Sequence, residues 1–122
     1  SLVLKLRQDS AKPQPEPHAT ELTLLRNRML DNPQLDWNVA EMAKELHLST
    51  GHFQLLYKRT FGVTCMDDCI AGRLQMAKER LIYTSNTVLE ISESCGYHNV
   101  EHFCRQFRKY VGCSPGAFRR KG

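Results

Sequence analysis

A repeat inside the chain restricts its fold more than any other feature of the sequence. Four residues keep the i, i+3, i+4 and i+7 spacing of one helix face, namely Val39, Met42, Ala43 and Leu46. The same offsets return 49 residues later (Val39 to Val88), at Val88, Ile91, Ser92 and Cys95. A helical pattern that recurs at a fixed shift indicates two copies of one helical unit.

Both copies also begin alike. Asn38 stands before the first pattern and Thr87 before the second, and a glutamate follows each after three residues, Glu41 or Glu90. This is the spacing of a capping box. In it the side chain of the cap residue accepts a hydrogen bond from the N3 backbone N–H, and the N3 glutamate side chain accepts one from the backbone N–H of the cap residue. The sequence therefore predicts a short helix after each cap.

A second helix is expected after each short one. The breaks lie at 47–49 and 96–99, where Ser49 and Asn99 can cap the next helix. Apolar stripes come next, at Phe53, Leu56, Tyr57 and Phe61 in the first copy and at Phe103, Phe107 and Val111 in the second. Each copy then ends in a glycine and a hydroxyl residue that suit a helix stop and a new cap, Gly62 with Thr64 and Gly112 with Ser114.

Two further helices complete the pattern. One at 21–31 has the apolar face Leu22, Leu25 and Met29, and a longer one at 65–83 has the stripe Ile70, Leu74, Ala77 and Leu81. At ~1.5 Å per residue the longer helix spans about 25 to 28 Å. We therefore predict an all-α fold of about seven helices, in which a linker helix joins two helix-turn-helix, homeodomain-like subdomains. The expected bounds are 20–64 for the first lobe, 65–83 for the linker helix and 84–122 for the second lobe.

Residues 1–19 are expected to be an upstream tail and a Pro-rich linker. Pro13, Pro15 and Pro17 alternate with polar residues, which is typical of an extended linker. The apolar stretch 2–6 ahead of them is interpreted as the tail of another domain.

Composition limits the partners and the cellular location that we expect for the chain. The net charge is +4, from 17 Lys and Arg against 13 Asp and Glu, and this mild basic excess permits nucleic-acid binding. No apolar stretch approaches the roughly 18 residues that cross a bilayer, and no secretory signal is evident, so we expect a cytoplasmic location and no membrane partner. Five cysteines, an odd number, indicate reduced thiols.

A short helix, a tight turn and a second helix with a polar outer face make the helix-turn-helix plan. The second helix of such a unit fits the DNA major groove, so recognition helices are expected at 50–61 and 100–110. Successive major-groove segments on one side of B-DNA lie ~34 Å apart, and the linker helix can hold two recognition helices near that spacing. The sequence thus predicts sequence-specific binding of double-stranded DNA for transcription regulation, by a monomer that reads two adjacent segments.

The C-terminal part also resembles a known family. Three stretches, 91–97, 102–108 and 112–119, look like the C-terminal signature of AraC/XylS-type transcription regulators, and Arg73, Ala77 and Leu81 match that family's linking helix. The resemblance covers about residues 33–120. It implies the two-lobed fold and major-groove reading by both lobes. It further implies a bacterial activator that binds promoter DNA and contacts RNA polymerase. An upstream sensor domain is also implied, cupin-like as the first expectation and a phosphoacceptor receiver as the second.

Three positions depart from the family pattern. Ser92 stands where Ala is usual, and Cys65 stands where Pro is frequent. Leu55 aligns through the repeat with Arg105, where many relatives carry a long polar or basic side chain. Leucine can touch a thymine methyl group but cannot donate a hydrogen bond, so the first lobe is expected to read less sequence than the second.

Base-reading residues are expected on the helix faces that the apolar stripes leave free. They are Gly51, Gln54 and Leu55 in the first recognition helix and Val100, Glu101, Cys104 and Arg105 in the second. Gln54 can pair with adenine. Arg105 can bond guanine O6 and N7 or else pair with Glu101, and Glu101 can accept from cytosine N4 or only orient Arg105.

Phosphate contacts are expected from hydroxyl, amide and cationic side chains near the helix starts and edges, namely Ser49, Thr50, Lys58, Asn99, His102 and Arg108. The basic end formed by Arg119, Arg120 and Lys121 either touches the DNA backbone or is solvated.

The sequence gives less support for metal binding, thiol sensing or catalysis. Cys95, His98, His102 and Cys104 lie close enough in sequence for a zinc site, and Cys65 and Cys69 for thiol sensing, but core packing is the expected role of these cysteines. No Gly-rich phosphate loop or paired catalytic carboxylates occur, so no enzyme, cofactor or metal is expected. Two alternatives stay open: a Cys–His transferase that acts on DNA, and a helical protein-interaction module without DNA contact.

Overall fold

A computed structural model of the chain describes residues 18–121, so the expected upstream tail and Pro-rich linker fall, up to residue 17, outside the described residues. Residues 18–121 form seven α-helices and no strand: α1 (Ala19–Asp31), α2 (Val39–Glu45), α3 (Thr50–Phe61), α4 (Cys65–Tyr83), α5 (Val88–Ser94), α6 (Val100–Val111) and α7 (Pro115–Lys121). The all-α prediction is confirmed. None of the helices in this range is long and apolar enough to cross a membrane.

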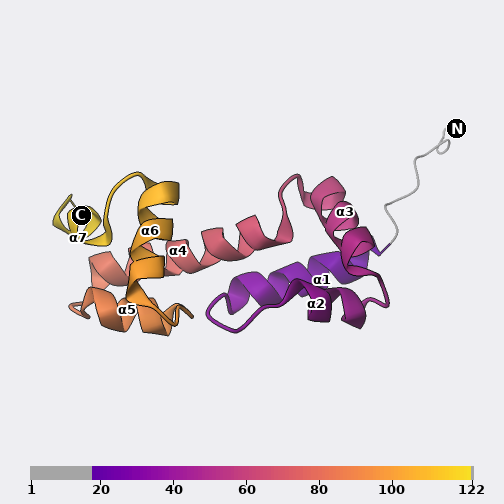
Figure 1. Ribbon diagram of the computed structural model, residues 1–122, viewed down its shortest axis with the longest axis horizontal. Coiled ribbons are helices and arrows are strands. Elements are labelled where there is room, and N and C mark those ends of the chain that lie inside the picture. Colours follow the sequence, from indigo (N-terminus) through magenta and orange to yellow (C-terminus); the bar gives the residue numbers. More distant parts are fainter. Residues whose placement is uncertain (1–17, 122) are drawn as a thin grey trace, which may run out of the picture.

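The seven helices form two lobes at the two ends of α4 (Figure 1). α1 and α3 pack against α4 in the first lobe, with α2 on α3, and α5 and α7 pack against α4 in the second lobe, with α6 on α5 and α7. α3 and α6 lie in different lobes, with α7 beyond α6, and both run across the direction of α4 (Figure 1). The predicted arrangement of two helical units on a linker helix is therefore present.

Helix α4 belongs to both hydrophobic cores. Thr64 starts it by accepting a hydrogen bond from the Asp67 backbone N–H at 3.1 Å, and Asp67 itself suits the positive end of the helix. Cys65 and Cys69 pack in the first core. The predicted stripe of Ile70, Leu74, Ala77 and Leu81 packs in the second. Since one helix closes two cores, the lobes share a rigid axis of roughly 28 Å.

The caps that the repeat predicts are present. Asn38 accepts from the backbone N–H of Glu41 at 3.0 Å, and Thr87 accepts from that of Glu90 at 3.1 Å. The capping box is complete only in the second lobe, where Glu90 also accepts from the Thr87 backbone N–H at 2.8 Å. Each short helix therefore starts where the sequence places it.

The turn between the two helices of each unit needs a left-handed residue. His47 has φ 60° in the first lobe, and Gly96 has φ 94° at the repeat-equivalent position of the second. Glycine adopts this region without strain, whereas a side chain makes it unfavourable. The second turn therefore has the less strained backbone.

The C-terminal helix α7 is anchored by Arg119. Its guanidinium donates to the backbone oxygens of Leu81 at 3.0 Å and Thr84 at 3.1 Å, where α4 ends. These carbonyls have no partner within a helix, and an arginine here both satisfies them and complements the negative end of the helix dipole. The alternative of a solvated side chain is therefore wrong for Arg119, because a long-range contact holds it on α4.

Candidate nucleic-acid interface

Helix α3 presents one apolar and one polar face. Ser49 caps it by accepting from the His52 backbone N–H at 3.2 Å, and Phe53, Leu56 and Tyr57 are buried in the first core. Four of the residues proposed from sequence lie exposed on the other side: Gly51, Gln54, Leu55 and Lys58. Leu55 keeps 54% of its surface exposed although it is apolar. The face therefore offers an amide, a cation and one apolar contact to a groove.

Helix α6 repeats this division with more charge. Phe103 and Phe107 are fully buried, and Asn99 caps the helix by accepting from the His102 backbone N–H at 2.8 Å. Four of the proposed residues on this helix are exposed: Glu101, His102, Arg105 and Arg108. α6 ends at Val111, one residue later than predicted.

Two residues expected to face outward on α6 do so only in part. Cys104 is half-buried and packs against the second core, and Val100 is half-buried as well. Both lie at the border of the buried stripe, where a small side chain folds toward its apolar neighbours. This border position leaves Arg105 and Glu101 as the most accessible of the proposed base readers on α6.

Arg105 makes no ion pair with any other residue of the range 18–121. The sequence left open whether it pairs with Glu101, and no ion pair between these two side chains occurs within residues 18–121. An unpaired guanidinium on an exposed helix face has all its donors available for a bidentate contact.

The phosphate candidates divide into two kinds. Ser49 and Asn99 already accept from backbone N–H groups as caps, so only the rest of their hydrogen-bonding capacity is free. The other four are exposed: Thr50, Lys58, His102 and Arg108. The His102 ring packs edge-on against Tyr97, with ring centroids 5.5 Å apart, which holds it at the start of α6.

Sequence reasoning missed one side chain on this surface. His52 is exposed in the first turn of α3, at the position that the repeat makes equivalent to His102. The shift of 50 between His52 and His102 is the signal that could have identified it. His52 is therefore a further phosphate candidate.

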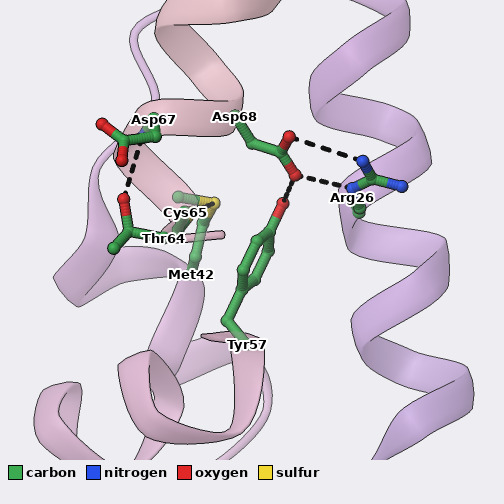
Figure 2. A network of polar contacts seen from close by, with 7 residues as sticks. All are labelled: Arg26, Met42, Tyr57, Thr64, Cys65, Asp67 and Asp68. Atoms are coloured by element: carbon green, nitrogen blue, oxygen red, sulfur yellow. Dashed lines mark hydrogen bonds and ion pairs between the residues drawn. The ribbon is translucent and has the colours of Figure 1, made fainter. Parts of the chain in front are cut away.

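A polar network holds α3 against the rest of the first lobe. Asp68 on α4 accepts from the Tyr57 hydroxyl at 2.6 Å and from Arg26 Nε at 2.6 Å, with a longer bond from Arg26 Nη2 at 3.4 Å (Figure 2). Arg26 lies on α1, and its guanidinium stacks over the Phe61 ring at 4.7 Å. One carboxylate thus joins α1, α3 and α4.

The charge state of this network is set by its contacts. Burial alone would raise the pKa of Asp68, but the hydrogen bonds from Arg26 and Tyr57 outweigh it and lower the pKa. Burial and the adjacent Asp68 carboxylate raise the pKa of the Tyr57 hydroxyl. Near neutral pH, Asp68 is therefore ionised and Tyr57 is a stable donor to it.

The second lobe fills the equivalent positions with aromatic rings. Through the shift of 50, Tyr57 corresponds to Phe107 and Asp68 to Phe118. The rings of Phe107 and Phe118 meet edge to face, with centroids 5.6 Å apart. Helices α3 and α6 are thus attached by different chemistry, a charged network in one lobe and aromatic packing in the other.

The buried cysteines behave as core residues. Burial raises the pKa of the Cys65 thiol to about 12 and also raises the pKa of Cys69 and Cys95. Of the residues weighed for zinc, Cys95 is buried while His98 is exposed, and the described residues contain no group of three or more potential ligands arranged around a metal.

A thiol reagent should separate the cysteines into two groups. Cys104 and Cys113 are half-buried, and the other three, Cys65, Cys69 and Cys95, are buried. With a chromogenic disulfide reagent at a mildly alkaline pH we expect rapid reaction at Cys104 and Cys113 and slow reaction elsewhere, because a thiol must be both accessible and ionised to react. Mass spectrometry after a short pulse locates the labels. Rapid labelling of Cys65 in the folded protein would contradict its packing role.

Comparison with known proteins agrees with this geometry. A family described as "Helix-turn-helix domain" matches residues 42–121. The "RCS-specific HTH-type transcriptional activator RclR" of Escherichia coli K12 is 31% identical over 94 residues, which cover 77% of this chain and 33% of RclR. The chain thus spans about a third of the length of this relative.

Two solved structures share the fold. A transcriptional regulator of Chromobacterium violaceum, described among AraC-type DNA-binding domain-containing proteins, has a TM-score of 0.71 and 24% identity, with 87% of this chain and 92% of that chain covered. The DNA-binding domain of AdpA, in complex with a target DNA, has a TM-score of 0.74 and 21% identity, with 84% and 90% covered. At these identities the likeness shows the fold alone.

The family match covers residues 42–121, which is more than half of the chain and runs from within α2 through α4 to the end of α7. The chain therefore belongs to the AraC/XylS-type family, as a helix-turn-helix DNA-binding domain of a transcription regulator.

Proposed function

We propose that the domain binds double-stranded promoter DNA sequence-specifically by placing α3 and α6 in two successive major-groove segments. The observation that carries this proposal is the exposed polar face on each of these helices, held in the two lobes that one helix, α4, joins. With α4 about 28 Å long, the separation approaches the ~34 Å of one duplex turn. One chain then reads two half-sites as a monomer.

The proposed division of contacts follows the exposure of the side chains. Base edges are read by Gly51, Gln54 and Leu55 on α3 and by Val100, Glu101, Cys104 and Arg105 on α6. Phosphates are bound by Ser49, Thr50, Lys58, Asn99, His102 and Arg108. Because α6 combines an unpaired guanidinium with a carboxylate, the second lobe discriminates more strongly between bases.

The proposal for the parts of the protein outside this domain rests on the properties of the family. The domain acts in the cytoplasm under an upstream sensor domain, cupin-like or of the phosphoacceptor type, and contacts RNA polymerase when it activates. The AdpA domain that shares the fold was solved with its target DNA, which supports duplex DNA as the ligand here.

Selection from a random duplex library tests the function, because the selection itself identifies the operator sequence. We expect the enriched sequences to contain two conserved windows whose centres are about 10 to 10.5 base pairs apart. Affinity for the selected duplex should fall steeply with salt, since bound phosphates release counterions. Salt-independent or sequence-independent binding would instead support the protein-interaction module as the second candidate.

Replacing Arg105 by Ala should remove the discrimination of one base pair. If the guanidinium bonds guanine O6 and N7, we expect a loss of about 1 to 3 kcal/mol in binding that disappears when that pair is changed. Fluorescence anisotropy on matched duplexes measures both values.

The variant Arg105→Lys is the control for charge alone. Lysine keeps the positive charge but lacks the planar guanidinium that bonds a base at two points. A contact with phosphate would therefore be kept in Arg105→Lys, whereas discrimination between base pairs would be lost. If Arg105→Lys keeps full discrimination, Arg105 contacts the backbone and does not read the base.

A further inference from the structure

We infer that the loop between α1 and α2, residues 32–38, sets the distance between the two recognition helices and thereby selects the half-site spacing that the domain accepts. We call it the interlobe loop. The inference rests on the proposed binding of two half-sites. Figure 1 shows the loop extending along α4 toward the turn between α5 and α6.

The two lobes approach each other closely at Gly96. A Cβ atom at this glycine would lie 2.5 Å from the Gln34 backbone oxygen, 3.0 Å from its carbonyl carbon and 3.1 Å from its Cα. Ordinary contacts of a Cβ atom begin at 3.4 Å. The first lobe thus touches the recognition turn of the second lobe backbone to backbone, and any side chain at position 96 would separate them.

Arg73 fixes the same loop to α4. Its Nε donates to the Pro33 oxygen at 2.7 Å and its Nη2 to the Leu35 oxygen at 2.8 Å. The guanidinium also lies 5.9 Å from the centroid of the Tyr97 ring, next to Gly96 in the chain. One side chain of α4 therefore contacts both lobes where they meet.

The loop itself is well braced. Pro33 is buried against α4. A Cβ atom added at Gly72 of α4 would lie 3.2 Å from the Pro33 Cβ atom, so the loop and the helix are close at this point. The Trp37 indole donates to the Asn32 oxygen at 2.8 Å, and the Leu35 backbone N–H donates to the same oxygen at 3.2 Å. A loop with these internal bonds transmits a displacement at one end to the other.

The contact leads directly to the second recognition helix. Tyr97 follows Gly96, and its hydroxyl donates to Gln106 Oε1 on α6. Its ring also packs against Phe103, with centroids 5.2 Å apart. A shift of the turn at Gly96 therefore moves α6 relative to α3, which lies on the other side of the interlobe loop.

DNA spacing is sensitive to such a shift. Each base pair inserted between two half-sites moves one of them by about 3.4 Å and turns it by about 34° around the duplex. When two binding units are held as one body, paired sites bind about 100-fold or more tighter than one site alone, provided that the geometry allows both contacts. A rigid interlobe contact restricts this gain to one spacing.

The test compares Gly96→Ala with Gly112→Ala. Both glycines have a left-handed φ, +94° and +101°, so both variants carry similar backbone strain, but a Cβ atom at Gly112 meets nothing within 4 Å. Each protein is titrated with a paired-site duplex from the selection, with duplexes that have one base pair more or fewer, and with a duplex that holds a single half-site.

For the wild type and Gly112→Ala, we expect at least about a tenfold loss of affinity for either altered spacing. Gly96→Ala should bind the preferred spacing about tenfold more weakly, discriminate spacings less, and bind the single half-site within about threefold of the wild type. Arg73→Lys should behave like Gly96→Ala, because lysine cannot span both carbonyls. Identical spacing profiles for Gly96→Ala and Gly112→Ala would overturn the inference.

Amide exchange in the free protein gives a second measure that does not depend on DNA. The Leu35 and Trp37 backbone N–H groups are bonded within the interlobe loop. Both should exchange faster in Gly96→Ala than in Gly112→Ala if Gly96 supports the loop. A wild type that binds no paired duplex sinks the proposed function, whereas equal exchange in the two variants sinks the interlobe contact.

Discussion

Replacing Asp68 by Ala should lower the free energy of unfolding by about 3 kcal/mol and the melting temperature by about 12 to 20 °C. The carboxylate is buried, and its loss leaves the buried Tyr57 hydroxyl without its acceptor and Arg26 without its counter-charge. The Arg26 side chain keeps 33% of its surface exposed and can rehydrate, which places the loss at the lower end of the range for a broken buried pair.

The effect should depend on pH in a defined direction. Since folding lowers the pKa of Asp68, its contribution is present above the unfolded pKa of about 3.9 and is lost as the pH falls through the lower folded value. The stability difference between wild type and Asp68→Ala should therefore be largest near pH 7 and shrink below about pH 4. Urea unfolding at pH 7 and pH 3, followed by Trp37 fluorescence, measures it.

The neighbouring Asp67 provides the matched control. It is exposed, and among the described residues 18–121 its side chain accepts only a long hydrogen bond of 3.4 Å from the Tyr110 hydroxyl. Asp67→Ala should cost less than about 1 kcal/mol. Equal losses for the two variants, or a deficit in Asp68→Ala that stays constant down to pH 3, would show that the network does not stabilise the first lobe.

Replacing Phe107 by Ala should destabilise the domain by about 3 to 5 kcal/mol, with little dependence on pH. The ring is fully buried, and it packs on Phe103 with centroids 5.7 Å apart and on Phe118 at 5.6 Å. Truncation removes apolar contacts and leaves a cavity between α6 and α7 that the shared helix α4 cannot close. These contacts are between uncharged rings, which is why the deficit should be the same at pH 7 and pH 3.

Phe107→Leu serves as the control, because it keeps most of the buried volume and should cost less than about 1.5 kcal/mol. Calorimetry gives the total loss, and amide exchange of α6 against α3 shows which lobe carries it. We expect faster exchange in α6. A loss below about 1 kcal/mol, or faster exchange in α3 alone, would contradict the role of the aromatic cluster in holding α6.

The repeat made helices α3 and α6 predictable, whereas the contacts that attach them to their lobes could not be derived from it. Position 57 is Tyr and position 107 is Phe, and both fit an apolar stripe equally well. The hydroxyl of Tyr57 indicates a polar partner only when Asp68 and Arg26 are brought beside it, and Arg26 is 42 residues from Asp68. In the second lobe, Phe118 occupies the corresponding place and no charge is needed.

In the candidate interface, too, the sequence predicts the exposure of some residues but not of others. The stripe of buried phenylalanines predicts that Arg105 and Glu101 face outward, and both are exposed. It does not predict that Cys104, at the edge of the stripe, packs against the second core. Whether a side chain at the border of the stripe is buried depends on its neighbours in the folded protein, and the neighbours of Cys104 come from other parts of the second lobe.

Local pattern alone determined the seven helices, their caps and the polar faces of α3 and α6. Helix periodicity and capping act over three to seven residues and can be read from neighbouring positions. Only the tertiary structure decided that Asp68 joins three helices, that Arg119 closes the end of α4, and that Gly96 meets Gln34. These contacts join groups 11 to 62 residues apart (Tyr57 to Asp68, Gln34 to Gly96), and they form only after the helices have packed, because no short-range pattern encodes which groups of different helices will meet.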